Sequence, residues 1–195
     1  MHPWLFPLDA EMSSRYSLVF DSLRATAWLR LRGVSIDGTV RCEGPPPLVD
    51  TSGHVQLARQ VAFRSRSARS EIGALKGGQL YIGERTFVNQ GASIVAALKI
   101  WIGDDVRIGD FVAVYDANYH ALEPGAQAET APVTIGDNVW LGRGVIVLPG
   151  VSIGRHSVVA AGAVLTSSLP DGVLAAGNPA RIIRQLIRQD GWRRG

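Results

Sequence analysis

The sequence predicts a mainly-β protein that forms a solenoid of short parallel strands. Its second half carries twelve aliphatic residues spaced six apart, and Gly directly follows six of them. A period of six fits neither an amphipathic helix nor a half-buried strand. It is typical of a β-helix, in which each six-residue unit supplies one side of a triangular coil. These period-six residues are Ile82, Val88, Ile94, Ile102, Ile108, Val114, Ile135, Leu141, Val147, Ile153, Val159 and Leu165.

A helical segment is expected at the N-terminus, within residues 1–33. Apolar residues between Ser13 and Arg32 follow a helical spacing, with Ser13 or Ser14 as a cap and Gly33 as a stop. We expect this helix to pack on the solenoid or on a neighbouring subunit. The alternative, which is not favoured, is a basic amphipathic helix lying on a membrane near a lipid-linked substrate. The expected apolar stripe is Leu18, Val19, Phe20, Leu23, Ala27, Trp28 and Leu31.

The solenoid is expected over residues 34–178. Most positions two before the period-six residues are also small or aliphatic, so stacked coils would bury a continuous apolar column. Residues 34–66 are interpreted as early, less regular coils, and residues 67–78 as a surface loop. The period slips after Ile94 and again after Val114, and the second slip predicts an external loop over residues 116–131.

Residues 179–195 are expected to form a short C-terminal helix and a tail. The stretch PARIIRQLIRQD begins at Pro179, and Pro is favoured at the first helical position. Its apolar residues would cover the open end or the flank of the solenoid.

Composition narrows the function classes. The formal net charge is only +3, and no basic stripe with interleaved aromatic residues suggests nucleic-acid binding. The single cysteine, Cys42, excludes an internal disulfide and a cysteine-type zinc site. The first ten residues do not resemble a signal peptide, and no stretch approaches the length of a membrane span. A cytoplasmic protein is therefore expected.

Four segments resemble the hexapeptide-repeat acyltransferases, which have a left-handed parallel β-helix. They are TFVNQG, VYDANYH, the run PVTIGDNVWLGRGVIVLPGVSIGRHSVVAAGAVLTSSLP, and AAGNPARII. The resemblance is strongest to the branch of galactoside, maltose and surface-glycan O-acetyltransferases. It implies transfer of an acetyl group from acetyl-CoA to a hydroxyl of a sugar or bacterial glycan. The N-terminal part and the short loop after His120 depart from the sugar-acetylating members, which favours a glycan or a carrier-linked sugar.

The resemblance implies that His120 is the general base, because imidazole titrates near neutral pH and can take a proton from a hydroxyl. Asp116 would either orient this imidazole or simply form a turn, and the sequence does not separate the two roles. Asn89, which matches an Asn beside the catalytic His, would contact the acceptor or the acetyl group; otherwise it would be a left-handed turn residue. Backbone N–H groups near Gly142 would hold the oxyanion.

Acetyl-CoA is expected as co-substrate, and no metal is required. The resemblance places its pantetheine arm along the coils between two subunits of a homotrimer and its phosphates on arginines, which bind phosphate with a planar fork. Trp140 would shape the acyl pocket or serve as a subunit contact. The expected cofactor-binding residues are Trp140, Gly142, Arg143, Ala161, Thr166, Ser167, Arg181 and Arg184.

Three other functions compete with this one. An amino-sugar or xenobiotic acetyltransferase would share the same base and CoA site. A γ-type carbonic anhydrase would need three histidines around zinc, and only His120 is suitably placed. A non-catalytic solenoid scaffold would be favoured by loss of the His or the CoA motif, and neither is lost.

Overall fold

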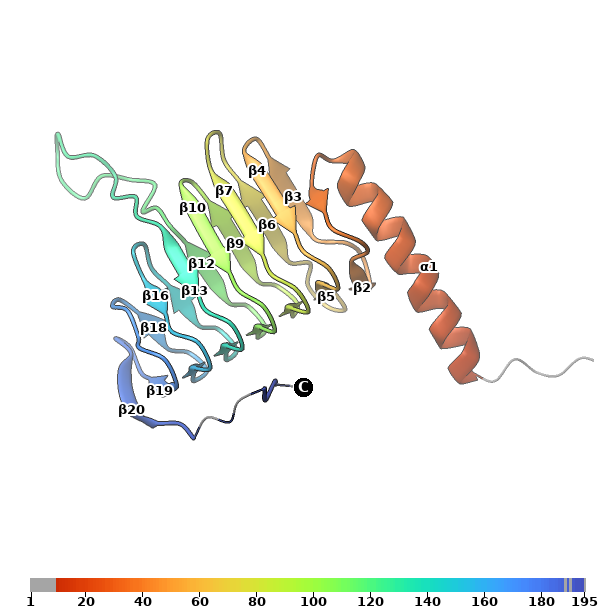
Figure 1. The fold of residues 1–195 in the computed structure, drawn as a ribbon. Helices are drawn as coiled ribbons and strands as arrows, with labels where there is room; N and C mark the ends of the chain where they lie inside the picture. The colour runs from red at the N-terminus through yellow and green to blue at the C-terminus, as the bar shows by residue number, and fades with distance from the viewer. Residues whose placement is uncertain (1–9, 188, 190, 195) are drawn as a thin grey trace, which may run out of the picture.

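The protein is a parallel β-solenoid whose first coil is capped by one long helix, as the computed structural model in Figure 1 shows. The structure describes residues 10–187, 189 and 191–194. Three sheets form the sides of the solenoid, and successive strands pass from one sheet to the next, so neighbouring strands in a sheet belong to successive coils.

The three sheets, named A, B and C, are parallel throughout except for the last strand of sheet B. Sheet A contains β1 (Ser35–Ile36), β4 (His54–Leu57), β7 (Gln79–Ile82), β10 (Lys99–Ile102), β13 (Val133–Ile135) and β16 (Ser152–Ile153). Sheet B contains β2 (Arg41–Glu43), β5 (Ala62–Arg64), β8 (Phe87–Val88), β11 (Arg107–Ile108), β14 (Trp140–Leu141), β17 (Val158–Val159), β19 (Val173–Ala176) and β20 (Arg181–Gln185). Sheet C contains β3 (Leu48–Thr51), β6 (Glu71–Ala74), β9 (Ser93–Ala96), β12 (Ala113–Tyr115), β15 (Ile146–Val147) and β18 (Val164–Leu165).

The buried core is the column that the period of six predicts. All twelve period-six residues are at most 2% exposed, and they lie in register from coil to coil. In sheet A, for example, Ile102 pairs with Ile82 on one side and with Ile135 on the other. Residues two positions earlier, such as Ile100 and Val133, are buried beside them, which confirms that each side sends two groups inward.

The glycines after the period-six residues are required by the closeness of the next coil. At Gly154 a Cβ atom would lie 2.3 Å from the backbone nitrogen of Asp171 and 2.4 Å from the carbonyl carbon of Pro170. A positive φ is found instead at other corner glycines, including Gly162, where a Cβ would meet nothing within 4 Å. The repeat therefore uses Gly for two different reasons.

The stretch expected as a surface loop, residues 67–78, contains a regular strand, so that prediction was wrong. β6 pairs with β3 and β9 in sheet C and buries Ile72 and Ala74. Residues 34–66 likewise form paired strands of the first two coils. The small side chains of Gly73 and Ala74 obscured the apolar pattern here, because the period depends on larger aliphatic residues.

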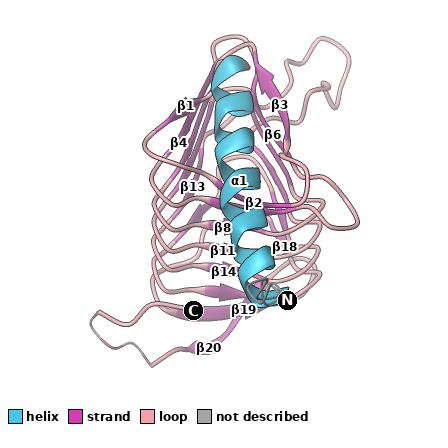
Figure 2. Ribbon diagram, turned by 90° about the vertical axis from the view of Figure 1, so that its right-hand side faces the viewer, coloured by secondary structure: helices cyan, strands magenta, loops and turns pink. Residues whose placement is uncertain are grey.

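The N-terminal helix α1 (Ala10–Leu31) packs across the open end of the solenoid, as expected, and Figure 2 shows it lying over the first coil. Of the predicted stripe, only Trp28 among the residues whose side chains are described packs against the core, and the side chain of Leu18 lies outside the described part. Val19, Leu23 and Leu31 are more than half exposed, whereas a face of small and hydroxyl-bearing residues is buried. That buried face consists of Ser22, Ala25, Thr26 and Leu29.

Hydrogen bonding to the edge of sheet B explains why this face of α1 is the buried one. β2 is the edge strand of sheet B, and its outer side offers unpaired backbone groups. The backbone N–H of Val40 donates to Thr26 Oγ1 at 3.0 Å, and the N–H of Cys42 donates to Ser22 Oγ at 3.4 Å. Leucines at these positions would leave buried donors unsatisfied. No helix in the described part of the chain is long and apolar enough to span a bilayer.

The predicted C-terminal helix is also wrong. Residues 181–185 form β20, which pairs antiparallel with β19 and extends sheet B by one strand. The open edge of β19 offers backbone partners, and the β-branched pair Ile182 and Ile183 suits a strand. Both isoleucines remain exposed. Residues 188, 190 and 195 of the predicted segment lie outside the described residues.

We predict that Gly154→Ala lowers the free energy of unfolding by about 3 kcal/mol, because the added Cβ meets backbone rather than a movable side chain. Gly162→Ala, the matched control, should cost about 1 kcal/mol, the cost of a left-handed conformation in open space. Urea unfolding followed by circular dichroism measures both. Equal losses for the two variants would contradict the close-approach explanation.

Candidate functional site

The described residues form a groove of about 1140 Å³ on the outer face of sheet B. It crosses β2, β5, β8, β11 and β14, and the C-terminal tail, Trp192–Arg194, lies along it. Two residues singled out from the sequence, Asn89 and Trp140, line this groove. The side chains of sheet B that point outward therefore meet at one surface, although they come from segments a hundred residues apart.

Asn89 immediately follows β8, at the corner where the chain turns from sheet B into sheet C. Its backbone is not in the left-handed region, so the alternative interpretation as a left-handed turn residue does not hold. Its Oδ1 accepts the backbone N–H of Gln90 at 3.0 Å, and its carbonyl oxygen accepts Ser70 Oγ at 2.8 Å. The side-chain NH2 donates to no group among the described residues, which leaves two donors for a ligand.

Trp140 lies in β14, in register with Arg107 of the preceding coil and Val158 of the following one. Its side chain is 48% exposed. Gly142, two residues later, donates its backbone N–H to Val159 at 2.8 Å. This hydrogen bond belongs to the ladder between coils, so the N–H of Gly142 itself is not free to hold an oxyanion, and the predicted donors would be other backbone N–H groups near it.

The external loop projects from the solenoid between β12 and β13, as Figure 1 shows. Its base is held by an antiparallel bridge between Ala117 and Thr130. His120 lies beyond this bridge with an exposed side chain, and its N–H donates to the carbonyl of Asn118 at 2.7 Å. It does not line the groove on sheet B.

Asp116 is fully buried where the loop leaves the solenoid. Its carboxylate accepts the backbone N–H groups of Ala97, Leu98 and Lys99. These residues form the wide corner of the preceding coil, which is the first slip in the period. Asp116 thus joins the two irregular corners, and these contacts are those of the turn-forming role rather than of a group that orients His120.

The predicted site residues divide between two corners of the solenoid. Asn89, Gly142, Arg143 and Ala161 lie at the corner between sheets B and C. His120 and the pair Thr166–Ser167 lie at the corner between sheets C and A. A sheet C strand of four residues, such as β9, separates the corners by roughly 13 Å within one chain. Within one chain, His120 and Asn89 therefore belong to different corners.

The remaining predicted cofactor residues are accessible. Arg143 is stacked over the Phe111 ring at 5.1 Å, and its guanidinium is 3.9 Å from the Asp110 carboxylate. Ala161, Thr166 and Ser167 are exposed at their corners. Arg181 and Arg184 are exposed on β20, the last strand of sheet B, and among the described residues each donates only to a nearby backbone carbonyl.

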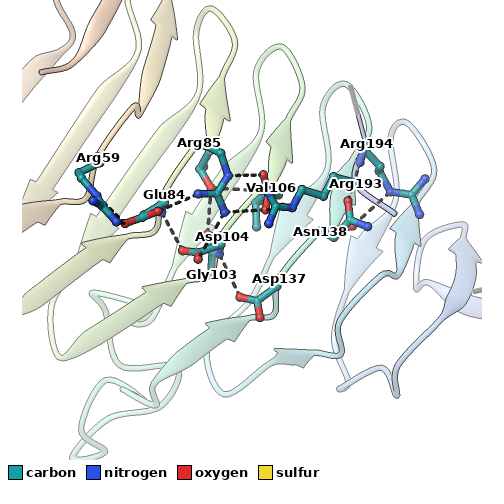
Figure 3. A network of polar contacts seen from close by, with 12 residues as sticks. Arg59, Glu84, Arg85, Gly103, Asp104, Val106, Asp137, Asn138, Arg193 and Arg194 are labelled. Carbon is teal, nitrogen blue, oxygen red and sulfur yellow. Dashed lines mark hydrogen bonds and ion pairs between the residues drawn. The ribbon is translucent and has the colours of Figure 1, made fainter. Parts of the chain in front are cut away.

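A polar network fixes one border of the groove and the tail beside it (Figure 3). Arg85 donates to both oxygens of Asp105 at 2.8 and 2.9 Å and to Glu84 at 2.7 Å. Hydrogen bonding to Arg85 lowers the pKa of Asp105, which also attracts Arg193 of the tail at 3.4 Å.

The tail is held mainly by Asn138. Its Nδ2 donates to the carbonyl of Trp192 at 3.0 Å, and its Oδ1 accepts the N–H of Arg194 at 2.9 Å. Arg194 Nη2 in turn donates to the carbonyl of His156 at 3.0 Å. Sequence reasoning missed this contact, because Asn138 occupies an ordinary left-handed corner position and its partner lies more than fifty residues away.

The described residues support neither a cysteine nucleophile nor a metal site. Cys42 is buried in β2, and burial, with repulsion by Asp21, raises the pKa of its thiol to about 12, so it is not a nucleophile. No group of three or more His, Cys, Asp or Glu side chains in the described ranges has the arrangement of a metal site.

Comparison with known proteins shows that part of the chain is similar to bacterial transferases and to acetyltransferases. The family model for bacterial transferase hexapeptide (six repeats) matches residues 132–167. A putative acetyltransferase of Saccharomyces cerevisiae, YJL218W, is 42% identical over 118 residues, 58% of this chain and 60% of that protein. Galactoside O-acetyltransferase of Escherichia coli is 37% identical over 117 residues, 58% of each protein. The chain spans less than two thirds of either relative's length.

Solved structures share the fold over more of the chain. The hexapeptide-repeat-containing acetyltransferase VCA0836 of Vibrio cholerae superposes with a TM-score of 0.58 and 27% identity over 92% of this chain and 95% of that one. A galactoside acetyltransferase in complex with coenzyme A superposes with a TM-score of 0.55 and 26% identity, over 78% of this chain and 65% of that one.

We predict that Asp116→Asn lowers the free energy of unfolding by about 2 kcal/mol, because a neutral amide keeps one acceptor oxygen for three backbone donors. Asp37→Asn, an exposed control, should change it little. Chemical denaturation measures the difference. Unchanged stability together with a large loss of acetyl transfer would instead indicate that Asp116 orients His120.

Proposed function

We propose that this chain, a member of the bacterial hexapeptide-repeat transferase family, is an acetyl-CoA-dependent O-acetyltransferase acting on a hydroxyl of a sugar or glycan. The observation that carries the proposal is the distribution of the predicted site over two corners of one solenoid. One corner has Asn89 and the row Gly142, Arg143 and Ala161, while the other has His120 with Thr166–Ser167. Two copies packed side by side would join these corners into one complete site.

The row at the corner between sheets B and C suits an extended cofactor. Gly142 and Ala161 follow one another in successive coils, and a Cβ at Gly142 would lie 2.6 Å from the backbone nitrogen of Ala161, so the surface there is narrow and smooth. The row leads toward β20, where Arg181 and Arg184 are exposed. A pantetheine arm would lie along the row, and its phosphates would meet the two arginines.

The chemistry follows from a thioester donor and a hydroxyl acceptor. His120 would remove the proton from the acceptor hydroxyl, and the oxygen would attack the thioester carbonyl carbon. Collapse of the tetrahedral intermediate breaks the carbon–sulfur bond and releases CoA as a thiolate, which takes the proton back from His120. Asn89 would donate its free NH2 hydrogens to the acceptor or the acetyl oxygen. No acyl-enzyme is needed, in keeping with the buried, poorly acidic thiol of Cys42.

A homotrimer is the assembly that this arrangement favours. Three triangular solenoids standing side by side would each present one corner to a neighbour and close the ring by symmetry. Each of three equivalent sites would then combine Asn89 of one copy with His120 of the next. The exposed loop that holds His120 projects from the solenoid and would reach toward such an interface.

We expect the acceptor to lie in the groove on sheet B. Its exposed indole rings, Trp140 and Trp192, give flat apolar surfaces against which the C–H faces of a sugar ring can pack. The similarity to galactoside O-acetyltransferase supports a carbohydrate hydroxyl as the group that is acetylated. The groove is open rather than enclosed, which suits a glycan chain as well as a single sugar.

The direct test is to measure acetyl transfer and CoA binding by His120→Ala. We expect kcat to fall at least 100-fold, the size of a lost general base, while calorimetry shows unchanged acetyl-CoA affinity. His54→Ala, an exposed histidine on β4, is the matched control and should keep full activity. Turnover retained by His120→Ala would remove the base assignment, and absence of acetyl-CoA binding by the unaltered protein would favour a scaffold.

A further inference from the structure

The groove on sheet B is rich in arginine. Among its lining residues, six are arginines and one, Asp105, is acidic. Three of the arginines already have carboxylate partners: Arg64 pairs with Glu43, and Arg85 and Arg193 pair with Asp105. The other three, Arg41, Arg107 and Arg194, form no ion pair within the described ranges, so the groove has an excess of positive charge.

Two of these unpaired cations are held rigidly by neutral groups. Arg107 donates to the carbonyl oxygens of Arg85 at 2.8 Å and of Arg194 at 2.7 Å. Arg194 donates to the carbonyl oxygens of Asn138 at 3.1 Å and His156 at 3.0 Å. Burial without a carboxylate partner lowers the pKa of Arg194. Holding partly buried guanidinium groups together costs free energy, which an incoming anion would recover.

Arg41 is the accessible member of the three. It lies on β2 with an exposed side chain that forms no hydrogen bond to any described residue. Arg64 of β5, which also lines the groove, lies over the Phe87 ring at 5.2 Å, so the wall between β2 and β8 combines cationic and aromatic surface. Planar guanidinium groups bind carboxylate and phosphate oxygens with two parallel hydrogen bonds.

Arg41 and Arg107 lie on different strands of sheet B from the residues expected to bind CoA. The strand order runs from β2 through β8, which ends beside Asn89, to β14 and finally β20. The residues expected to bind CoA lie from β14 to β20, whereas Arg41 and Arg107 lie from β2 to β11. Arg41 thus lies on the side of Asn89 away from the CoA phosphates, where the acceptor would lie, and Arg107 lies between Asn89 and the first of the expected CoA residues.

From these contacts we infer that the acceptor is an acidic glycan, whose sugar units carry a carboxylate or phosphate bound by Arg41 and Arg107. The tail contributes Trp192 and Arg194 and forms one wall of this acceptor site. This inference rests on the proposed function for the acetyl donor and names the chemical class of the acceptor.

The test is calorimetric binding of matched oligosaccharide pairs to the full-length protein. The carboxylate arm compares trigalacturonate and oligosialic acid with the same compounds after reduction of their carboxylates to alcohols. The phosphate arm compares phosphorylated maltotriose with maltotriose. We expect at least one acidic member to bind about tenfold more tightly than its neutral counterpart, and the arm in which this occurs identifies the anion.

Two arginine variants test whether Arg41 binds the anion. Arg41→Gln should weaken binding of the acidic member about tenfold and leave that of the neutral member unchanged. Arg155→Gln, which changes another exposed arginine outside the groove, should leave both unchanged. Equal binding of acidic and neutral members, or binding by none of them, overturns the inference, as does equal weakening by both variants.

Acetyl transfer to the same compounds separates the two proposals. Acetylation of neutral and acidic members with equal kcat/KM would overturn the acidic acceptor and leave the acetyltransferase intact. Tight, Arg41-dependent binding of acidic members without any acetyl transfer would support the acidic ligand and overturn the acetyltransferase.

Discussion

Backbone pairing between successive coils is the constraint on which the rest of this molecule depends. Each coil donates and accepts hydrogen bonds with the coils on either side, so the position of a residue within its coil is fixed by its neighbours. Inward residues therefore stack into a column, and outward residues stack into rows. The row Phe87, Arg107 and Trp140 is one such outward row, and it becomes the floor of the groove on sheet B. The candidate functional residues of this fold therefore lie either in outward-facing rows of side chains or at the corners between sheets.

At each end of the solenoid the outermost strands have no neighbouring strand on one side, so their backbone N–H and C=O groups need other hydrogen-bond partners. At the first coil, hydroxyl groups of α1 supply these partners. Ser22 and Thr26 accept hydrogen bonds from backbone N–H groups in and next to β2. At the last coil the chain folds back as β20 and covers β19. In the tail, Trp192 and Arg194 are bonded to Asn138 beside sheet B. Closing the end of the solenoid thereby places Trp192 beside the groove.

The periodic part of this fold could be predicted from the sequence, because every coil repeats the same burial at the same spacing. The two termini could not. The stripe through Val19 and Leu23 indicated the wrong face of α1, since edge hydrogen bonding rather than apolar burial selected the face. The segment from Arg181 has helical apolar spacing but is recruited by an open strand edge. Asn89 and Trp140 were found through their motifs, whereas the tail's part in the groove depends on long-range contacts that no local pattern contains.

The central claim is that one active site combines two corners from two copies of the chain. Co-expression of Asn89→Ala with His120→Ala tests it, because each variant alone lacks one half of every site. Randomly mixed trimers should recover about a quarter of the unaltered protein's acetyl transfer, since each mixed trimer has one intact pairing. Recovery near this level is the predicted result. Mixed assemblies with no more activity than either variant alone would contradict a shared site and would require both residues to act within a single copy.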